Sequence, residues 1–473
     1  MKPLPLSALR DLPPADAGAA ALLRAELARD CRKLVVLDDD PTGVQTVHDV
    51  SVYTRWRPGD LLAAFRERNK VFYILTNSRA MTPEETTAIH REIADAAAYA
   101  ARETGKPYLY LSRSDSTLRG HYPLETRLLR EALEAAGTAV DGEILCPFFP
   151  EGGRYTLHGV HYVRQGETLV PAAETEFARD KTFGYAHSYL PDYIEEKTGG
   201  ACRAADVTVL DIELLRSGRY DELEARLLAV RDFGKVVVDA AAYEDLEAFA
   251  VALYRAMGKG KTFLFRTAAG LVKVLGGIPD RPLLTRAELV SRETGRGGVV
   301  VVGSHTRKTT AQLEALLRLD NLAPIAFDSD KVLEGQAALD AEVARCVALE
   351  EAAMDAGKTA VVYTCRKLLT LEGDTRESAL RRSVQISDAV QQLVGRLRGT
   401  PAFVIAKGGI TSSDVGTRAL GVRRATVLGQ IRPGIPVWKT GPESKFPGVP
   451  YVIFPGNAGD EEDLRRAVEV FRS

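Results

Sequence analysis

Short apolar runs alternate with longer segments of helical periodicity along most of the chain. The run Leu34–Leu37 ends in polar residues and a turn, which is typical of a buried strand. Similar strands are predicted at Val71–Thr76, Tyr108–Ser112, Glu143–Cys146, Val207–Asp211, Lys235–Asp239 and Thr262–Arg266. Helices are predicted between them, for example at Pro83–Glu103 and Leu124–Ala136, and one at Asp16–Arg32 with Asp16 as its N-cap. The alternation predicts an α/β fold with a mainly parallel sheet.

A second series of strands follows two glycine-rich breaks, at Gly276–Pro282 and Thr294–Gly298. Its strands are predicted at Val299–Val302, Thr359–Thr364, Ala402–Ala406, Ala425–Leu428, Pro436–Lys439 and Tyr451–Phe454. We therefore expect two α/β domains with mainly parallel sheets, at residues 1–290 and 291–473. Residues 150–200 interrupt the rhythm with glycines, histidines and tyrosines, and we interpret them as a long functional excursion or lid.

The composition excludes several classes of protein. With 473 residues, 45% hydrophobic and 27% charged, the chain is typical of a soluble protein of two or three domains. Its net charge of −2 gives no reason to expect nucleic acid or a membrane as partner. Five scattered cysteines without a C-x-x-C pair predict neither a disulfide framework nor a zinc site. With no secretory signal and no apolar run of about 18 residues, we expect a cytoplasmic protein and leave a homo-oligomer open.

Three consecutive carboxylates, Asp38, Asp39 and Asp40, follow the first buried strand, and Thr42 and Gly43 then turn the chain. The carboxyl ends of strands in an open parallel sheet are where such folds bind ligands. Adjacent carboxylates repel one another, so the site must supply cations, hydrogen bonds or a metal. Gly43 is predicted to let a ligand approach the backbone.

Two further polar clusters follow strands and are expected at the same edge of the sheet. One contains Asn77 and Arg79, and the other contains Asp115, Ser116 and Arg119. This mixture of carboxylates, hydroxyls, an amide and guanidinium groups suits a polyhydroxylated acid. Arg119, together with Arg79, is predicted to bind its carboxylate.

A fourth cluster, Phe148–Gly159, contains His158. No acid–histidine spacing supports a metal site there, so we interpret His158 as a surface or substrate-binding residue.

Glycine-rich loops follow strands in the second half, and backbone amides at such turns favour phosphate. Their candidate cofactor-binding residues are Ser304, Thr306, Lys407, Gly408, Gly409, Thr411, Ser412, Gly441 and Lys445. Three such loops in one domain are typical of a nucleotide site, although neither a Walker A motif nor a G-x-G-x-x-G motif after a strand is present.

Several of these pieces, in this order, resemble the four-carbon acid sugar kinase family. The matching segments are Asp39–Gly43, Asp115–Gly120, Cys146–Pro150, Gly303-Ser304, Gly408–Ser412 and Lys439–Gly441. The resemblance implies an amino-terminal sugar-acid domain, a carboxy-terminal nucleotide domain and an active site in the cleft between them. It also implies ATP-dependent phosphorylation of a tetronate or oxo-tetronate hydroxyl. Two departures are Ile410, where an acidic residue is frequent, and Lys439–Ser444, which replaces the usual Lys-Ser-Gly-Asn-Phe-Gly ending.

The expected enzyme is therefore a carbohydrate kinase that uses ATP with Mg²⁺. Its acid sugar (threonate, erythronate or a 3-oxo-tetronate), the hydroxyl that reacts and the protein ligands of Mg²⁺ stay open. Asp39 is the first choice for the catalytic base and Asp115 the reserve.

Two other functions compete with this prediction. Asp38-x-Asp40-x-Thr42 resembles the nucleophile motif of haloacid-dehalogenase-like phosphatases, with Asp239 as a poor candidate for their later acid. A non-catalytic sugar-acid sensor would leave the glycine-rich loops unexplained.

Overall fold

The computed structural model describes residues 2–290, 293–367, 369, 371, 373–456 and 458–472. Its contacts divide the chain into a first unit, residues 1–43 and 55–280, and a second unit, residues 44–54 and 281–473. The main division thus falls between Asp280 and Arg281. The short segment 44–54 belongs to the second unit although the residues on both sides of it belong to the first, which the sequence pattern did not predict.

The first unit is built on a sheet in which all neighbouring strands are parallel. The strand order is β10 (Thr208–Leu210), β11 (Gly234–Val238), β6 (Gly142–Cys146), β12 (Phe263–Thr267), β5 (Tyr108–Arg113), β2 (Lys33–Asp38) and β4 (Val71–Leu75). All residues of β2, β4 and β6 are buried, because helices cover both faces of a parallel sheet. Their apolar runs therefore predicted them well.

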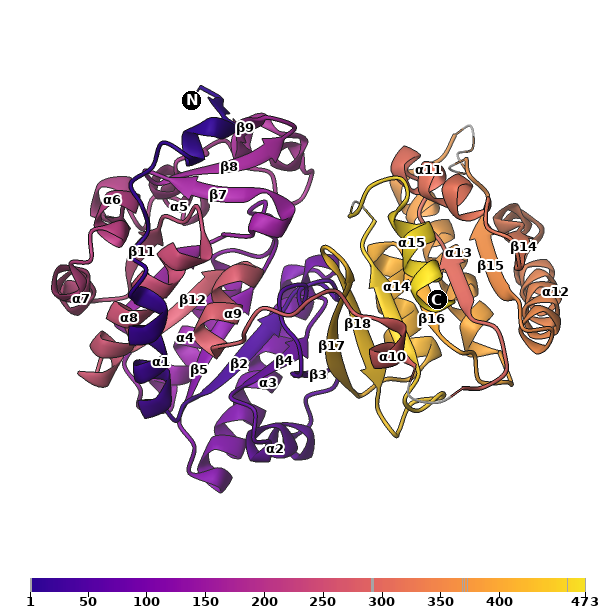
Figure 1. Ribbon diagram of the computed structural model, residues 1–473, viewed down its shortest axis with the longest axis horizontal. Helices are drawn as coiled ribbons and strands as arrows, with labels where there is room; N and C mark the ends of the chain where they lie inside the picture. Colours follow the sequence, from indigo (N-terminus) through magenta and orange to yellow (C-terminus); the bar gives the residue numbers. More distant parts are fainter. Residues whose placement is uncertain are drawn as a thin grey trace. The chain divides into compact units, whose positions relative to one another are not determined.

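Helices pack against this sheet in two layers (Figure 1). One layer contains α2 (Pro58–Arg66), α3 (Pro83–Thr104) and α4 (Leu124–Ala135); the other contains α1 (Ala19–Arg29), α7 (Tyr220–Ala229) and α8 (Tyr243–Gly258). Shorter helices are α6 (Ile212–Arg216), α9 (Ala269–Gly276) and, in the second unit, α10 (Arg286–Leu289). The first helix begins later than predicted, with Gly18 as its N-cap. Asp16 instead accepts hydrogen bonds from the Gly18 amide (2.8 Å) and the Tyr220 hydroxyl (2.6 Å).

The excursion at residues 150–200 contributes a helix and three strands of a small antiparallel sheet, whose fourth strand comes from residues 4–5. The sheet order is β1 (Leu4–Pro5), β9 (Thr168–Pro171), β8 (Val160–Gln165) and β7 (Arg154–Leu157), and the helix is α5 (Leu190–Lys197). Three hydrogen bonds join the excursion to the backbone after β5. His161 Nε2 lies 2.8 Å from the Ser116 carbonyl, while the Tyr185 and Tyr193 hydroxyls donate to the carbonyls of Thr117 and Leu118 at 2.9 Å.

The second unit has a mixed sheet. Its order is β3 (Ser51–Tyr53), β17 (Arg424–Arg432), β18 (Ile435–Thr440), β19 (Pro450–Phe454), β16 (Val404–Lys407), β13 (Val299–Val302), β15 (Thr359–Thr364) and β14 (Leu322–Phe327). Pairs from β3 to β19 are antiparallel, and pairs from β19 to β14 are parallel. The main helices are α11 (Arg307–Leu316), α12 (Gln336–Asp355), α13 (Arg376–Gly395), α14 (Gly409–Asp414) and α15 (Asp463–Val470). The prediction of two α/β domains with mainly parallel sheets is confirmed, although β3 and β14 were missed.

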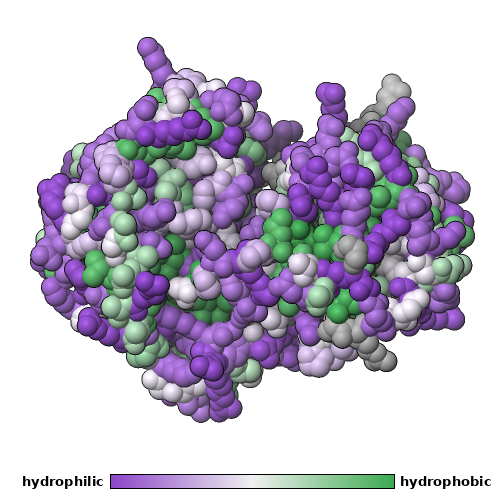
Figure 2. All heavy atoms as spheres, viewed as in Figure 1, coloured by the Kyte–Doolittle hydropathy of each residue, from purple (hydrophilic) through white to green (hydrophobic). Residues whose placement is uncertain are grey.

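The hydrophilic surface and the short or polar helices agree with the charged fraction of 27% in the sequence. Most side chains on the face shown in Figure 2 are hydrophilic. Among the described residues, every helix is too short or too polar to cross a membrane.

Candidate active site

In the parallel sheet of the first unit, the order in which the chain adds strands reverses between β2 and β5. From β2 the chain continues to β4 on one side, and from β5 it continues to β6 on the other. Open α/β sheets bind ligands outside the carboxyl ends of the strands at such a switch point. The residues that directly follow β2, β4 and β5 are therefore brought together, as the sequence predicted.

Asp39 is the most heavily bonded carboxylate at this point. Arg79 donates to both of its oxygens, from Nη2 at 2.5 Å and from Nε at 3.2 Å, and the Ser114 hydroxyl donates at 2.6 Å. Burial raises the pKa of Asp39, but the charges of Arg79, Arg113 and Arg266 and the hydrogen bonds from Arg79 together outweigh burial, so the pKa lies below its ordinary value. Asp39 is thus an ionised, almost inaccessible partner of Arg79.

The neighbouring Asp38 is also buried. Its carboxylate is 3.1 Å from Nη1 of Arg113, and burial raises its pKa to about 7 against the opposing charge of Arg113. A Cβ on Gly43 would lie 1.9 and 2.1 Å from the two oxygens of Asp38. Gly43 is therefore required to make room for the carboxylate of Asp38, and the predicted close approach of a ligand to its backbone is not needed to explain it.

Asp115 follows β5 and is held on one oxygen only. Its Oδ2 accepts hydrogen bonds from Thr117 and from Nε of Arg119 (2.6 Å), while no described residue donates to its Oδ1. Burial would raise the pKa of Asp115, but Arg79 and Arg119 together hold it well below its ordinary value. The side chain is 13% exposed, against 2% for Asp39, so Asp115 is the more accessible of the two predicted catalytic carboxylates.

The other predicted residues of this unit divide into two groups. Asp40 lies in the cluster, with Oδ2 3.5 Å from Nη1 of Arg79 and Oδ1 accepting from the Thr42 amide at 2.8 Å. Asn77 follows β4 in a left-handed conformation, and the Ser116 carbonyl anchors His161.

His158 lies apart from this cluster. Its amide donates to Asp239 at 2.6 Å, and its Nδ1 is 3.6 Å from Glu213. Asp239 follows β11, four strands from β2, which corresponds to roughly 19 Å at the usual strand spacing. The prediction of His158 as a substrate-binding residue is therefore not supported by its position.

The second unit contains a cavity of about 360 Å³ at the carboxyl ends of β13, β15 and β16. Its lining includes Ser304, Gly408, Gly409 and Thr411 from the predicted phosphate loops. Gly408 has φ of 125°, which favours glycine, and a Cβ on Gly303 would lie 2.2 Å from the Thr411 hydroxyl. Four apolar side chains that were not predicted also line the cavity: Leu369, Ile386, Val390 and Ile410.

Gly441 and Lys445 do not join this cavity, which corrects the sequence prediction. Gly441 follows β18, and β18 runs antiparallel to β19, so it lies beside the start of β19. Gly408 lies beside the other end of β19, roughly 13 Å away along the strand. Lys445 donates to the Gly395 carbonyl at 2.5 Å.

Three other predicted nucleotide residues have internal partners. Nζ of Lys407 donates to the carbonyls of Pro455 (2.6 Å) and Gly456 (3.0 Å), and burial lowers its pKa to about 7. The Ser412 hydroxyl donates to the Ala406 carbonyl at 2.8 Å, and the Thr306 side chain caps α11.

One glycine loop of the second unit, which the sequence prediction did not include, follows β19. Gly456 and Gly459 match the Gly-Asn-x-Gly part of the family ending that the sequence pattern placed at Lys439–Ser444, while Asn457 between them lies outside the described residues. The signal was available, since this glycine loop also follows a buried strand.

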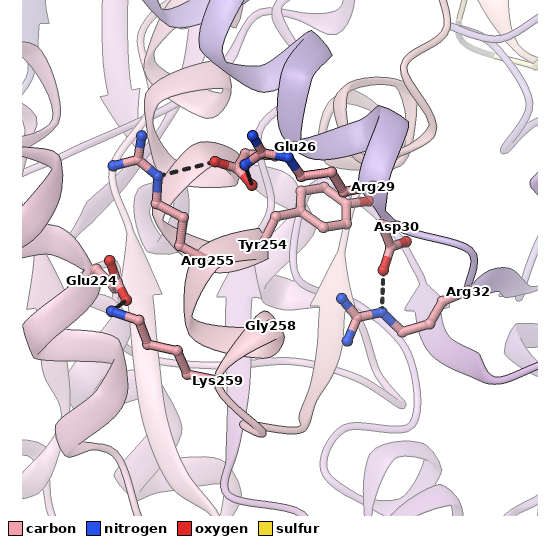
Figure 3. Close-up of a pocket in the computed structure, with 9 residues that line it drawn as sticks. All are labelled: Glu26, Arg29, Asp30, Arg32, Glu224, Tyr254, Arg255, Gly258 and Lys259. Carbon is pink, nitrogen blue, oxygen red and sulfur yellow. Dashed lines mark hydrogen bonds and ion pairs between the residues drawn. The ribbon is translucent and has the colours of Figure 1, made fainter.

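A second cavity, of about 470 Å³, lies in the first unit near the amino ends of β2 and β12 (Figure 3). Its charges pair with one another: Arg255 with Glu26 at 3.1 Å, Arg32 with Asp30 at 2.5 Å, and Lys259 with Glu224. Because the cavity lies near the amino ends of the strands, it is at the edge of the sheet opposite the carboxylate cluster. Its ion pairs leave little positive charge for an anionic ligand.

Comparison with known proteins assigns the two parts of the chain. Residues 34–275 match the model of the sugar-binding N-terminal domain, and residues 299–464 match the model of the nucleotide-binding C-terminal domain. The chain belongs to the four-carbon acid sugar kinase family. The predicted family is thus confirmed, and so, at the level of this family, is a carbohydrate kinase.

Similar proteins of this kinase family include two named enzymes. The chain is 29% identical over 293 residues to D-erythronate kinase from Heliobacterium modesticaldum, which covers 60% of each chain. It is 27% identical over 344 residues to 3-oxo-tetronate kinase from Cupriavidus necator, which covers 70% of this chain and 72% of that one.

Two crystal structures share the fold of this family member at low identity. A Salmonella typhimurium LT2 protein described as a candidate tRNA synthase is 18% identical, with TM-score 0.67 over 93% of this chain and 99% of its own. A Haemophilus influenzae protein is 19% identical, with TM-score 0.60 over 92% and 100%. At these identities the likeness shows the fold alone.

Proposed function

We propose that this protein is an ATP-dependent kinase that phosphorylates a hydroxyl of a four-carbon acid sugar, namely threonate, erythronate or a 3-oxo-tetronate. The observation that carries the proposal is a carboxylate–guanidinium cluster at the switch point of one sheet together with a phosphate-type cavity on a second sheet. The names of the similar kinases support the same substrate class.

We assign the triphosphate to the glycine-lined part of the second unit's cavity. Gly408 and Gly409 leave the backbone accessible, and Ser304 and Thr411 add hydroxyl groups. Arg366 lies next to this part, since its Nη2 donates to the Ser304 carbonyl. Its Nε and Nη1 are buried and have no acceptor among the described residues. We therefore assign Arg366 to holding the Ser304 loop through Nη2 and not to phosphate contact, because nitrogens that are closed to water are closed to phosphate oxygens as well.

The apolar part of the same cavity suits the nucleobase. Leu369, Ile386 and Val390 present aliphatic surface, which is the kind of wall that planar ligands contact in protein pockets. The described lining residues supply hydroxyls, backbone groups and the side chains of His305, Lys367 and Arg382, but no carboxylate. Mg²⁺ would therefore accompany ATP and take most of its ligands from phosphates and water, where it neutralises the charge that develops during transfer.

The catalytic base is assigned to Asp115, the reserve of the sequence prediction. Asp39 has most of its lone pairs occupied by Arg79 and Ser114, whereas Oδ1 of Asp115 is free of donors in the described part of the chain. The low pKa of Asp115 keeps this carboxylate ionised, so that it can orient the attacking hydroxyl and accept its proton as the bond to phosphorus forms. Asp40, Thr42, Asn77 and Ser116 remain proposed contacts for the sugar hydroxyls.

An ATP-coupled assay separates this function from its alternatives. The purified chain is incubated with ATP, Mg²⁺ and a panel of threonates, erythronates and 3-oxo-tetronates, and ADP and phosphorylated sugar are measured. We expect ADP release only with an acid sugar present. A phosphatase would instead hydrolyse phosphorylated tetronates and leave ATP intact, and a sensor would bind a tetronate without turnover. Either result would overturn the proposal.

The phosphatase alternative has a further structural difficulty. Such enzymes need an available acid at a later strand end, but the Asp239 carboxylate accepts backbone N–H groups from His158, Gly159 and Ile212. It is therefore committed to holding two loops.

A further inference from the structure

Arg154 is a largely buried cation without a carboxylate partner among the described residues. It begins β7, in the excursion that packs on the loop after β5. Its Nε is completely buried and has no hydrogen-bond partner in the described part of the chain. Buried polar groups are nearly always bonded, so an orphaned guanidinium nitrogen needs an explanation.

The other arginines of the cluster differ from Arg154 in this respect. Each of them lies within 4 Å of a carboxylate: Arg79 with Asp39, Arg113 with Asp38, Arg119 with Asp115, and Arg266 with Glu125. Arg154 forms no such pair with any described residue. Among the described residues of the cluster, Arg154 is thus the one arginine whose charge is not paired with a carboxylate.

The surroundings of Arg154 place it beside the proposed catalytic carboxylate. Its guanidinium lies 5.6 Å from the centre of the Phe177 ring, and the guanidinium of Arg119 lies 5.1 Å from the same ring. The charged and titratable groups that act on it are Asp115, Arg119, Glu176 and Tyr185. Burial lowers the pKa of Arg154, with Asp115 opposing this effect, so the folded protein carries a cation that is incompletely compensated.

We propose that Arg154 binds the carboxylate of the acid sugar and so selects acids over polyols. This inference rests on the proposed kinase function. It replaces the expectation that Arg119 and Arg79 bind this group, because both already hold carboxylates of the protein. The Nη1–Nη2 side of a guanidinium matches a carboxylate with two parallel hydrogen bonds, while the buried Nε of Arg154 stays inside the protein and Phe177 packs against the guanidinium.

The cost of removing Arg154 should appear in substrate binding and not in folding. Hydrogen bonds to charged groups correspond to a loss of roughly tenfold to a hundredfold in affinity when one partner is removed. We expect Arg154→Met to raise KM for the preferred tetronate by about this factor. Its thermal midpoint should equal or exceed that of the wild type, because the change removes an unpaired buried cation and keeps an apolar stem.

The decisive test combines this variant with a change in the substrate. The kcat/KM of wild type and Arg154→Met is measured for the preferred tetronate and for erythritol, which lacks the carboxylate. The wild type should strongly prefer the tetronate, and the variant should lose most of this preference, chiefly through a lower kcat/KM for the tetronate. Arg164→Met is the matched control, since Arg164 lies on the neighbouring strand β8 and is exposed beside Glu167. It should behave like the wild type.

Two results would overturn the assignment of Arg154. One is an unchanged preference for the acid in a folded Arg154→Met variant, and the other is a lowered thermal midpoint with all substrates affected equally. Failure of the kinase proposal looks different, because the wild type itself would then turn over no tetronate with ATP.

Discussion

The substitution Gly43→Ala tests how the acidic turn is built. A Cβ at this position would lie 1.9 and 2.1 Å from the carboxylate oxygens of Asp38 and 2.3 Å from its Cγ. These distances are far below van der Waals contact, so Asp38 must move. Its carboxylate would then leave Arg113, whose Nη1 lies 3.1 Å away in the buried interior.

The magnitude follows from the buried ion pair. Breaking such a pair by displacing one partner costs about 3–5 kcal/mol of unfolding free energy. For a unit of this size each kcal/mol corresponds to about 2–4 °C, so the thermal midpoint of the first unit should fall by about 6–20 °C. Differential scanning calorimetry on the full chain measures this shift. Gly59→Ala in α2 is the control, because no described atom lies within 4 Å of its Cβ position, and it should be neutral or slightly stabilising.

A double-mutant cycle identifies the cause of the loss. If the clash with the Asp38 carboxylate is responsible, adding Gly43→Ala to an Asp38→Ala background should cost far less than it does alone. Equal costs in the two backgrounds would refute the reasoning, as would a wild-type thermal midpoint for Gly43→Ala itself.

Three further changes test other parts of the molecule. Asp115→Asn should lower kcat about 10²–10⁴-fold with little change in KM for the sugar, whereas a loss confined to KM would make Asp115 a binding residue. Gly408→Val should raise KM for ATP at least tenfold and leave tetronate binding by calorimetry intact, because φ of 125° and Ser304 at 3.4 Å exclude a branched side chain; unchanged ATP kinetics would contradict the phosphate assignment. Burial raises the pKa of Glu350 well above 4.5, and neither of its oxygens has a partner in the described chain, so stability should fall as the pH rises above 4.5. Urea unfolding of Glu350→Leu should show a gain of roughly 1–3 kcal/mol at pH 8 and a smaller one at pH 4, and an equal gain at both would show that the charge is not the cause.

The sequence alone determined the two series of buried strands and the polar residues at their ends. Fully buried strands such as β2 and β13 read as continuous apolar runs, because both faces of a parallel sheet are covered. Once the strands are parallel, their following loops must share one edge, which is why the strand pattern by itself grouped Asp39, Arg79 and Asp115 correctly.

Tertiary structure decided strand direction, strand order and the pairing of charges. Gly441 looked equivalent to Gly408 in sequence, but β18 runs antiparallel to its neighbour and carries Gly441 to the opposite edge. His158 followed a promising motif, yet it lies beside Asp239 of a distant strand. Arg119 and Arg154 are both arginines near acids, and only the folded chain gives one a carboxylate and leaves the other without one among the described residues. Local pattern encodes burial and periodicity, whereas partners far apart in the sequence are chosen by packing.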